Sequence, residues 1–188
     1  MGFLRKLFGT DKRKGKPYVD GGMRLLANLV QSLGLDDWPN YLPNYTAAEQ
    51  EAIVSQLNEF QKIANEEIGG QALFHPEVVG PIQRTQIAVA LKDLAGEDWI
   101  FTDKSEVPKD WKLRVSTYLK AWAAGLDPVC LSEMADLLAR AGHRTEARDA
   151  LEVVLLFPTY ANVFYRGHDA SETANRIVSD AQTALQNL

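Results

Sequence analysis

The chain contains a single cysteine, Cys130, among its 188 residues. One cysteine cannot form an internal disulfide or a cysteine-based zinc cluster. The sequence therefore gives no argument for an oxidising compartment, and we expect a cytoplasmic protein. A chain of this length buries roughly 70% of the surface that it exposes when unfolded, so a hydrophobic core can hold it without a metal or a disulfide.

Long apolar runs are also absent. A helix that crosses a bilayer needs about 20 consecutive apolar residues, and no stretch of this sequence provides them. The beginning of the chain also lacks the apolar run and the cleavage site of a signal peptide. We therefore expect no transmembrane segment.

The residue patterns that catalysis requires are missing as well. The three histidines stand far apart and follow no metal-binding spacing, and neither a nucleophile elbow nor a phosphate-binding loop is present. Cys130 lacks a local pattern that would supply a base and an oxyanion donor. The adjacent acidic pairs Asp36-Asp37 and Glu66-Glu67 are typical of solvated surface. The sequence predicts no catalytic residue, no metal site and no cofactor, and it favours a protein that is not an enzyme.

Positive charge is concentrated at the N-terminus. Residues 1–17 carry six basic side chains and one acidic side chain, a net charge of +5, whereas the rest of the chain carries −10. An acidic body does not favour binding to nucleic acid, whose phosphates require a basic surface. We treat residues 1–17 as a basic tail and residues 18–188 as one helical domain.

The basic tail also has an apolar face. Its aromatic and leucine side chains fall on one side of a short helix, with two basic residues beside them. Such a segment is typical of reversible attachment to an anionic membrane surface, which would make this a peripheral membrane protein. Docking onto the protein's own body, or a frayed end, would explain the same pattern. The predicted membrane contacts are Phe3, Leu4, Arg5, Lys6, Leu7 and Phe8.

Helical periodicity runs through residues 18–188, and no convincing alternating strand interrupts it, which predicts an all-α fold. The most secure helix start is at Thr46 and Glu49, which are spaced as a capping box. Proline at 81 and at 108 is placed where it is tolerated in the first turn of a helix. The expected helices cover residues 20–34, 46–69, 81–95, 108–125, 129–141, 145–157 and 172–185.

Aromatic side chains gather in two segments that we expect to be loops, residues 35–45 and 159–168. Tyrosine and tryptophan give a large contact area with few rotatable bonds, so such loops serve as recognition surfaces. They also plug the ends of helical cores, and the sequence leaves both interpretations open. The candidate partner contacts are Trp38, Tyr41, Tyr45, Tyr160, Phe164 and Tyr165.

Residues 128–158 resemble a tetratricopeptide repeat (TPR), a family that pairs two antiparallel helices across a tight turn. The matching positions are Leu131, Met134, Ala135 and Leu138 in the first helix, Gly142 in the turn, and Ala147, Leu151 and Val154 in the second helix, while the closing Pro158 falls one residue earlier than in the family. The short side chains of Ala135 and Ala147 allow two helix axes to approach closely. Val154 departs from the family, which has a small residue there. The resemblance implies antiparallel helical hairpins in the C-terminal half and a concave surface that binds a peptide or a helix.

These observations predict a protein–protein interaction module, an adaptor or assembly factor whose partner is another protein or a peptide. The N-terminal tail adds the inner face of a membrane as a second partner. The alternative hypothesis is a helical enzyme or small-molecule-binding protein whose pocket follows no recognisable motif.

Overall fold

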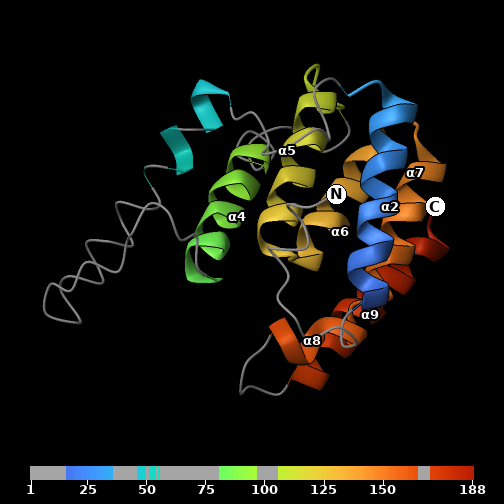
Figure 1. Cartoon of the computed structure of the whole chain (residues 1–188). Helices are drawn as coiled ribbons and strands as arrows, with labels where there is room; N and C mark the ends of the chain where they lie inside the picture. The colour runs from blue at the N-terminus through green and yellow to red at the C-terminus, as the bar shows by residue number, and fades with distance from the viewer. Residues whose placement is uncertain are drawn as a thin grey trace, which may run out of the picture. The chain divides into compact units, whose positions relative to one another are not determined.

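The structure is a computed structural model, and it describes residues 16–35, 46–49, 51–53, 55, 81–96, 106–164 and 170–188 (Figure 1). All regular secondary structure in these residues is helical, which confirms the predicted all-α class. The chain divides into two compact units. The terminal unit consists of Met1–Pro43 with Leu131–Leu188, and the central unit consists of Asn44–Cys130.

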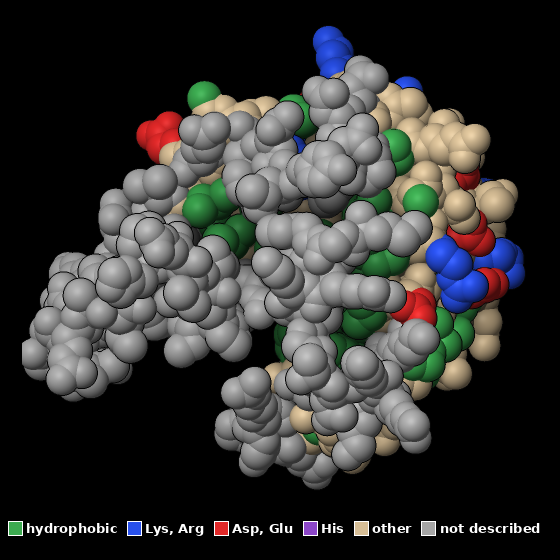
Figure 2. Space-filling view, in the orientation of Figure 1, with side chains coloured by type: hydrophobic (Ala, Val, Ile, Leu, Met, Phe, Trp, Pro, Cys, Tyr) green, Lys and Arg blue, Asp and Glu red, His purple; other side chains and the backbone are tan. Residues whose placement is uncertain are grey.

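In the terminal unit, two helices that are far apart in the sequence pack on the same pair of neighbours. Helices α2 (Lys16–Leu33) and α9 (Ala170–Gln186) each contact both α7 (Arg144–Val154) and α8 (Pro158–Phe164). Leu25, Leu26, Leu29 and Leu33 form the buried seam of α2, at the three- and four-residue spacing of one helix face. On the face shown in Figure 2, several of the described basic and acidic side chains lie beside one another at the right, and others stand alone along the upper edge.

Helix α2 begins earlier than its sequence pattern indicates. The expected start was Asp20, acting as a cap, but the helix begins at Lys16, and Pro17 stands in its first turn, where a missing N–H costs nothing. The predicted end is confirmed. Gly34 takes a left-handed φ of 60°, and the Leu35 N–H donates to the Val30 carbonyl at 3.1 Å, which closes a Schellman cap.

Helix α2 lies very close to the segment after α7. A Cβ atom built on Gly21 would stand 3.1 Å from Cδ1 of Leu156 and 3.6 Å from Cγ2 of Val153. Alanine at this position would already require the Leu156 side chain to shift by a few tenths of an ångström, whereas its distance from Val153 would be an ordinary van der Waals contact. Gly21 therefore permits the close packing of α2 on α7.

A tight turn joins α6 (Pro128–Arg140) to α7. Gly142 takes a φ of 86°, and the His143 N–H donates to the Leu138 carbonyl at 2.8 Å, so α6 also ends in a Schellman cap. This confirms the helix end that was predicted at Gly142. Beyond α7, the expectation of a loop over residues 159–168 was wrong for its first part. Pro158 begins the short helix α8, because proline suits the first turn of a helix as well as it ends one.

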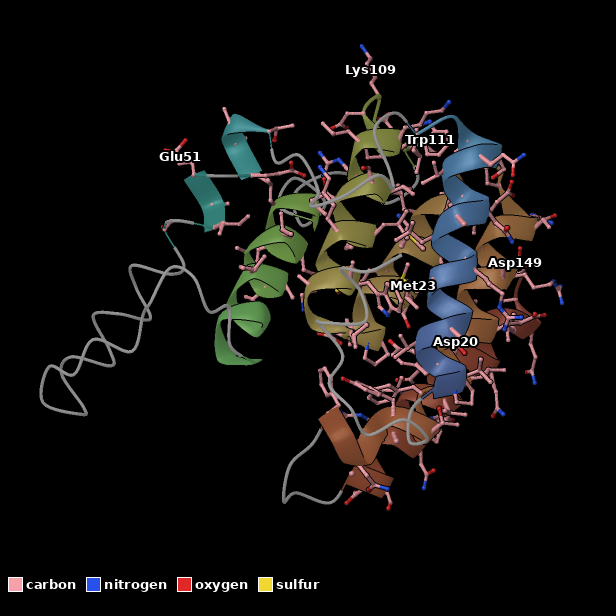
Figure 3. All side chains as sticks on the ribbon, in the orientation of Figure 1. Asp20, Met23, Glu51, Lys109, Trp111 and Asp149 are labelled. Carbon is pink, nitrogen blue, oxygen red and sulfur yellow. The ribbon has the colours of Figure 1, made fainter. Side chains whose placement is uncertain are left out.

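The central unit contains a helical segment at residues 47–49, 51–53 and 55, followed by α4 (Pro81–Gly96) and α5 (Trp111–Gly125), which pack against each other. Pro81 begins α4, as predicted. Pro108 does not begin α5: its carbonyl accepts a hydrogen bond from the Trp111 N–H at 3.1 Å, and Lys109 projects from the intervening turn (Figure 3).

Helix α5 ends at an unusual residue. Leu126 takes a left-handed φ of 57°, a conformation in which glycine is the usual residue. The sequence placed the end of this helix at Gly125. Leu126 is buried, and burying its side chain offsets the cost of the left-handed backbone.

Candidate functional site

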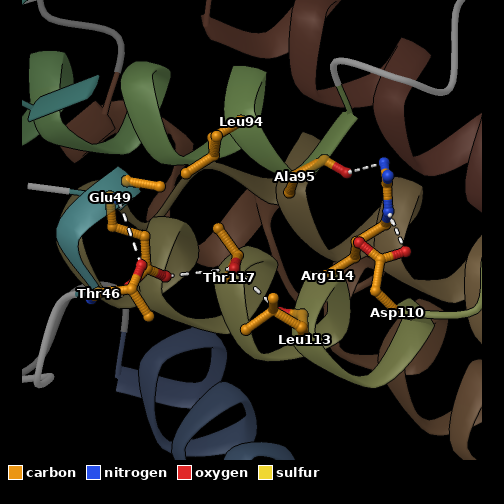
Figure 4. A pocket seen from close by; sticks show the side chains of 9 residues that line it. Thr46, Glu49, Leu94, Ala95, Asp110, Leu113, Arg114 and Thr117 are labelled. Carbon is orange, nitrogen blue, oxygen red and sulfur yellow. Dashed lines mark hydrogen bonds and ion pairs between the residues drawn. The ribbon is translucent and has the colours of Figure 1, made fainter. Parts of the chain in front are cut away.

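A pocket lined by several polar and charged side chains lies in the central unit. It has a volume of about 180 Å³ and is formed by the segment that begins at Thr46, the C-terminal end of α4 and the first half of α5 (Figure 4). Its lining residues are Thr46, Ala48, Glu49, Leu94, Ala95, Asp110, Leu113, Arg114 and Thr117.

Glu49 is the buried carboxylate of this pocket, with only 1% of its surface exposed. It forms the capping box that the sequence predicted. The Thr46 N–H donates to Glu49 Oε2 at 2.7 Å, and the Glu49 N–H donates to Thr46 Oγ1 at 3.3 Å. The Thr46 hydroxyl also donates to Glu49 Oε2, at 3.0 Å. Because both free N–H groups are satisfied reciprocally, the local sequence fixes where this helical segment starts.

Two residues of α5 meet the same carboxylate. Lys120 Nζ lies 3.0 Å from both Oε1 and Oε2 of Glu49, and Thr117 Oγ1 lies 3.2 Å from Oε1. Thr117 and Lys120 are three residues apart, so they share one face of α5. Both are buried, which makes the contact an ion pair shielded from water. We call Glu49, Thr117 and Lys120 the buried ion-pair cluster.

The environment of Glu49 keeps it ionised. Burial by itself raises the pKa of this carboxyl, but the hydrogen bond from the Thr46 backbone and the hydrogen bond and charge of Lys120 outweigh burial and lower the pKa below its ordinary value. A carboxylate with a lowered pKa cannot donate a proton near neutral pH. Glu49 therefore suits a structural role that joins the segment beginning at Thr46 to α5.

Arg114 makes a second connection within the central unit. Its Nη1 donates to the Ala95 carbonyl at 3.0 Å, and its Nε lies 3.1 Å from Asp110 Oδ1. Ala95 belongs to the last turn of α4, whose carbonyls have no partner inside the helix. A cation is favourable at this end of a helix, so Arg114 caps α4 and attaches it to α5.

The pocket is small for a ligand site. Ligand pockets in proteins commonly measure about 300–1,000 Å³, which exceeds its volume of about 180 Å³. The charged side chains of the pocket interact with one another. Its apolar lining includes Leu113, whose surface is 53% exposed. The arrangement can exclude water from the ion pair and hold three segments together.

The structure places two of the six predicted partner contacts, and both lie in α8. Tyr160 stacks on Tyr18 with ring centroids 5.7 Å apart, and Phe164 meets the ring of Phe157 edge-on at 5.7 Å. Both are half-buried, so they pack in the terminal unit and keep part of their surface accessible. Trp38, Tyr41, Tyr45 and Tyr165 lie outside the described residues, as do the predicted membrane contacts Phe3, Leu4, Arg5, Lys6, Leu7 and Phe8.

The hairpin at residues 128–158 buries the residues that its sequence pattern pointed inward. Ala135 and Ala147, the short residues predicted for a close helix approach, are 2% and 0% exposed. The larger inward positions are also buried, and they are Leu131, Met134, Leu138, Leu151 and Val154. The turn between the helices uses the left-handed Gly142 described above.

Cys130 is buried, with 1% of its surface exposed. His143 lies in the turn before α7, where its Nδ1 is 3.8 Å from Glu146 Oε1. Within the described ranges, no three histidine, cysteine, aspartate or glutamate residues gather as a metal site. Among the same residues, no helix combines the length and apolar character needed to cross a membrane.

Comparisons with protein-family models, with curated proteins and with solved structures find no match for this chain.

Proposed function

We propose that this chain is a non-enzymatic protein–protein interaction module, an adaptor or assembly factor of the cytoplasm. Its partner is another protein or a peptide, bound on a surface of the TPR-like hairpin at residues 128–158. The basic N-terminal tail holds the module at an anionic membrane surface. The chain then acts as a peripheral membrane protein that brings its partner to the bilayer.

The observation that carries this proposal is the burial pattern of the hairpin. Tetratricopeptide-like units keep their inward residues for helix packing and use the outward residues to bind extended peptides or helices. Here the inward set is buried, while Asp136 on α6 and Arg148 and Glu152 on α7 are exposed. This division of α6 and α7 into a packed face and a charged outer face supports a binding surface on the hairpin.

The geometry of the central pocket favours the module over the alternative hypothesis of a small-molecule-binding protein. Its buried acid is held ionised by the Thr46 backbone N–H and by Lys120, and the pocket volume is below the usual range for ligands. The buried ion-pair cluster explains why these charged residues are present without invoking a substrate.

Site-specific photo-crosslinking tests the proposal. A photoreactive phenylalanine analogue replaces Asp136, Arg148 or Glu152 in separate full-length proteins, and the matched control carries it at Asp93, an exposed residue of α4 in the central unit. In lysate of the source cell, we expect the hairpin positions to crosslink to one polypeptide that the Asp93 protein does not capture. That polypeptide should then bind the purified chain.

Two results would contradict the proposal. Equal crosslinking from Asp93 and from the hairpin would show that the hairpin is not the binding surface. If no polypeptide is captured at any position and native mass spectrometry finds a small molecule retained by the chain, the alternative hypothesis replaces this one.

A further inference from the structure

The outer face of α7 carries charged side chains that form no ion pair among the residues that the structure describes. Arg148 and Glu152 are exposed, and neither meets an opposite charge in that part of the chain. Arg144 shares the face, one turn before Arg148, and is also exposed and without an ion pair there. The face is therefore positive towards the start of the helix and negative at Glu152.

The order of the charges along α7 explains why Arg148 and Glu152 do not pair with each other. On α6 the acid comes first, and Asp136 accepts two hydrogen bonds from Arg140, four residues later. On α7 the base comes first, and this order is the less favourable one for a pair at the same spacing. Asp136 and Arg140 therefore satisfy each other within α6, whereas Arg148 and Glu152 are left for a partner.

A face that is positive at one end and negative at the other is complementary to a second copy of itself. In a twofold-symmetric contact, residue i of one copy meets residue j of the other, and j meets i. When two antiparallel copies of α7 cross at the level of Ala150, Arg148 of each copy lies opposite Glu152 of the other. The two unsatisfied charges then form two equivalent ion pairs.

The same alignment places apolar surface beside the ion pairs. Leu155 and Leu156 follow α7 and are half-buried, so part of each side chain is accessible. Leu155 falls opposite Thr145 of the other copy, and Leu156 falls opposite Arg144. The aliphatic stem of an arginine packs well on leucine while its charged end stays in water. The contact therefore combines charge pairing with some apolar burial.

The remaining acids of α7 lie to the side of this contact. Glu146 and Asp149 are half-buried, and they stand about 160° and about 100° around the helix from Arg148, at about 100° per residue. Helix α2 packs on that side of α7, where Gly21 approaches Val153. Neither acid therefore faces the second copy.

We propose that the chain forms a twofold-symmetric dimer through α7, in which Arg148 of each copy pairs with Glu152 of the other. A second copy of the chain therefore covers the outer face of α7. The contact is small, because a helix of 11 residues is about 16 Å long. Stable interfaces bury about 1,200–2,000 Å² and weaker encounters bury less, so we expect a dissociation constant on the order of 100 µM.

This inference goes beyond the proposed function and does not rest on it. The second copy covers the exposed residues of α7 to which we assign a protein partner, so the dimer and the partner complex exclude each other. At the low concentration of the chain in a lysate, a dimer this weak dissociates and leaves the face of α7 free. The experiments below use the purified full chain with no partner present.

Sedimentation velocity from about 10 µM to about 1 mM chain, in about 0.1 M salt, spans the expected dissociation constant. Arg148→Glu and Glu152→Arg should each weaken dimerisation by at least about tenfold, because symmetry turns two attractions into two repulsions. Arg176→Glu is the matched control. Arg176 is exposed on α9 and precedes the exposed Asp180 by four residues, so the same substitution there should leave dimerisation within twofold of the wild type. Circular dichroism verifies that each variant remains helical.

A mixture of the two charge-reversed chains tests the pairing itself. Fluorescently labelled Glu152→Arg is titrated with unlabelled Arg148→Glu, so that opposite charges face each other at both contacts of the heterodimer. This heterodimer should be about as tight as the wild-type dimer. Arg176→Glu has the same net charge as Arg148→Glu but restores only one of the two contacts, and it should bind the labelled chain more weakly.

A second measurement does not depend on reversing a charge. Arg148→Lys keeps the positive charge and adds an amine that a carbodiimide can join to a carboxylate. In a mixture of unlabelled and nitrogen-15-labelled Arg148→Lys chains, the reagent should link position 148 of one chain to Glu152 of the other. Mass spectrometry identifies this link as a peptide pair of mixed isotope content.

Three results would overturn the dimer. The wild type could sediment as a monomer over the whole concentration range, or Arg148→Glu and Glu152→Arg could weaken dimerisation no more than Arg176→Glu does. The labelled chain could also bind both titrants equally, with no mixed-isotope link to Glu152. Any of these results would leave the proposed function standing, and a dimer without a captured partner would leave this inference standing alone.

Discussion

Lys120 Nζ lies 3.0 Å from both carboxylate oxygens of Glu49, and the two residues are 71 positions apart in the chain. The side chains of both are almost completely shielded from water, at 9% and 2% exposed. An ion pair in this setting adds little stability compared with a well-packed apolar pair, but removing one partner leaves a charge buried without compensation. The relationship therefore makes the central unit sensitive to single substitutions at either position.

Glu49→Gln should destabilise the chain by about 3–5 kcal/mol, because Lys120 then loses its counter-charge. Urea unfolding followed by tryptophan fluorescence measures this, since the buried Trp122 lies on the same helix as Lys120. Asp136→Asn is the matched control. It removes the carboxylate that pairs with Arg140, but Asp136 is 52% exposed, so the change should be within about 1 kcal/mol. Equal effects of the two substitutions would contradict the importance of burial.

The stability of the chain should depend on pH through Glu49. The pKa of this carboxyl is lowered in the folded state, so the unfolded state takes up a proton first as the pH falls. Its stabilising contribution is complete above the ordinary glutamate pKa of about 4.3 and is lost as the pH falls through the lower folded value. Unfolding free energies between pH 6 and pH 2.5 should therefore fall less steeply in Glu49→Gln than in the wild type. Parallel curves for the two proteins would show that Glu49 does not contribute to the dependence.

Thr46→Ala should cost about 0.5–2 kcal/mol, which is typical for the loss of an N-cap side chain. Thr46→Ser keeps the hydroxyl that accepts from the Glu49 N–H and donates to Glu49 Oε2, so it should stay close to the wild type. The free energy of unfolding of the two variants tests this. If serine is as damaging as alanine, the methyl group of Thr46 and not its hydroxyl is responsible.

This part of the site also shows what the sequence could and could not predict. The contact between Thr46 and Glu49 joins residues three apart, so local spacing was enough to find it. Lys120 and Thr117 come from another helix, and only the tertiary fold brings them to Glu49. The available signal was a lysine within a run of α5 that is buried almost throughout, where a charged side chain requires a partner. That signal indicates that a partner exists but does not identify it.

The starts of α2, α5 and α8 differ from the predicted boundaries. Proline ends one helix and begins another equally well, so Pro158 fitted the closing position of a tetratricopeptide-like hairpin while in fact it starts α8. Gly142 was predicted correctly because its left-handed turn is a property of the local backbone. The start of α2 was missed although Pro17 stands in its first turn, where proline favours a helix start, and the contact of Tyr18 with Phe157 joins residues that only the tertiary fold brings together.

Gly142→Ala should destabilise the chain by about 1–2 kcal/mol, the cost of a side chain in the left-handed conformation. A Cβ on Gly142 would meet no other atom within 4 Å, so backbone strain alone determines the effect. Asparagine tolerates this conformation better than alanine, and Gly142→Asn should therefore lose less. Thermal unfolding of both variants compares them. An equal loss in both would assign the effect to something other than backbone strain.

Binding to anionic vesicles should depend on residues 1–17 and on ionic strength. The tail carries a net charge of +5, and its attraction to acidic lipids acts over the Debye length, which shrinks from about 10 Å at 0.1 M salt to about 3 Å at 1 M. Its four apolar side chains are too few to hold the chain without that attraction, because ordering the tail costs about 1–2 kcal/mol per residue. The fraction of chain that cosediments with vesicles should therefore fall in 1 M salt.

A chain that begins at residue 16 should lose most of its binding even in 0.1 M salt. This shortening keeps α2 whole and removes all but one of the tail's basic residues. The control replaces Arg5, Lys6, Lys12, Arg13 and Lys14 with glutamine, which keeps the apolar residues and removes most of the charge. If the glutamine protein in 1 M salt binds vesicles as tightly as the wild type does in 0.1 M salt, electrostatic attraction is not the basis of the tether. Insertion of the apolar side chains would then account for binding.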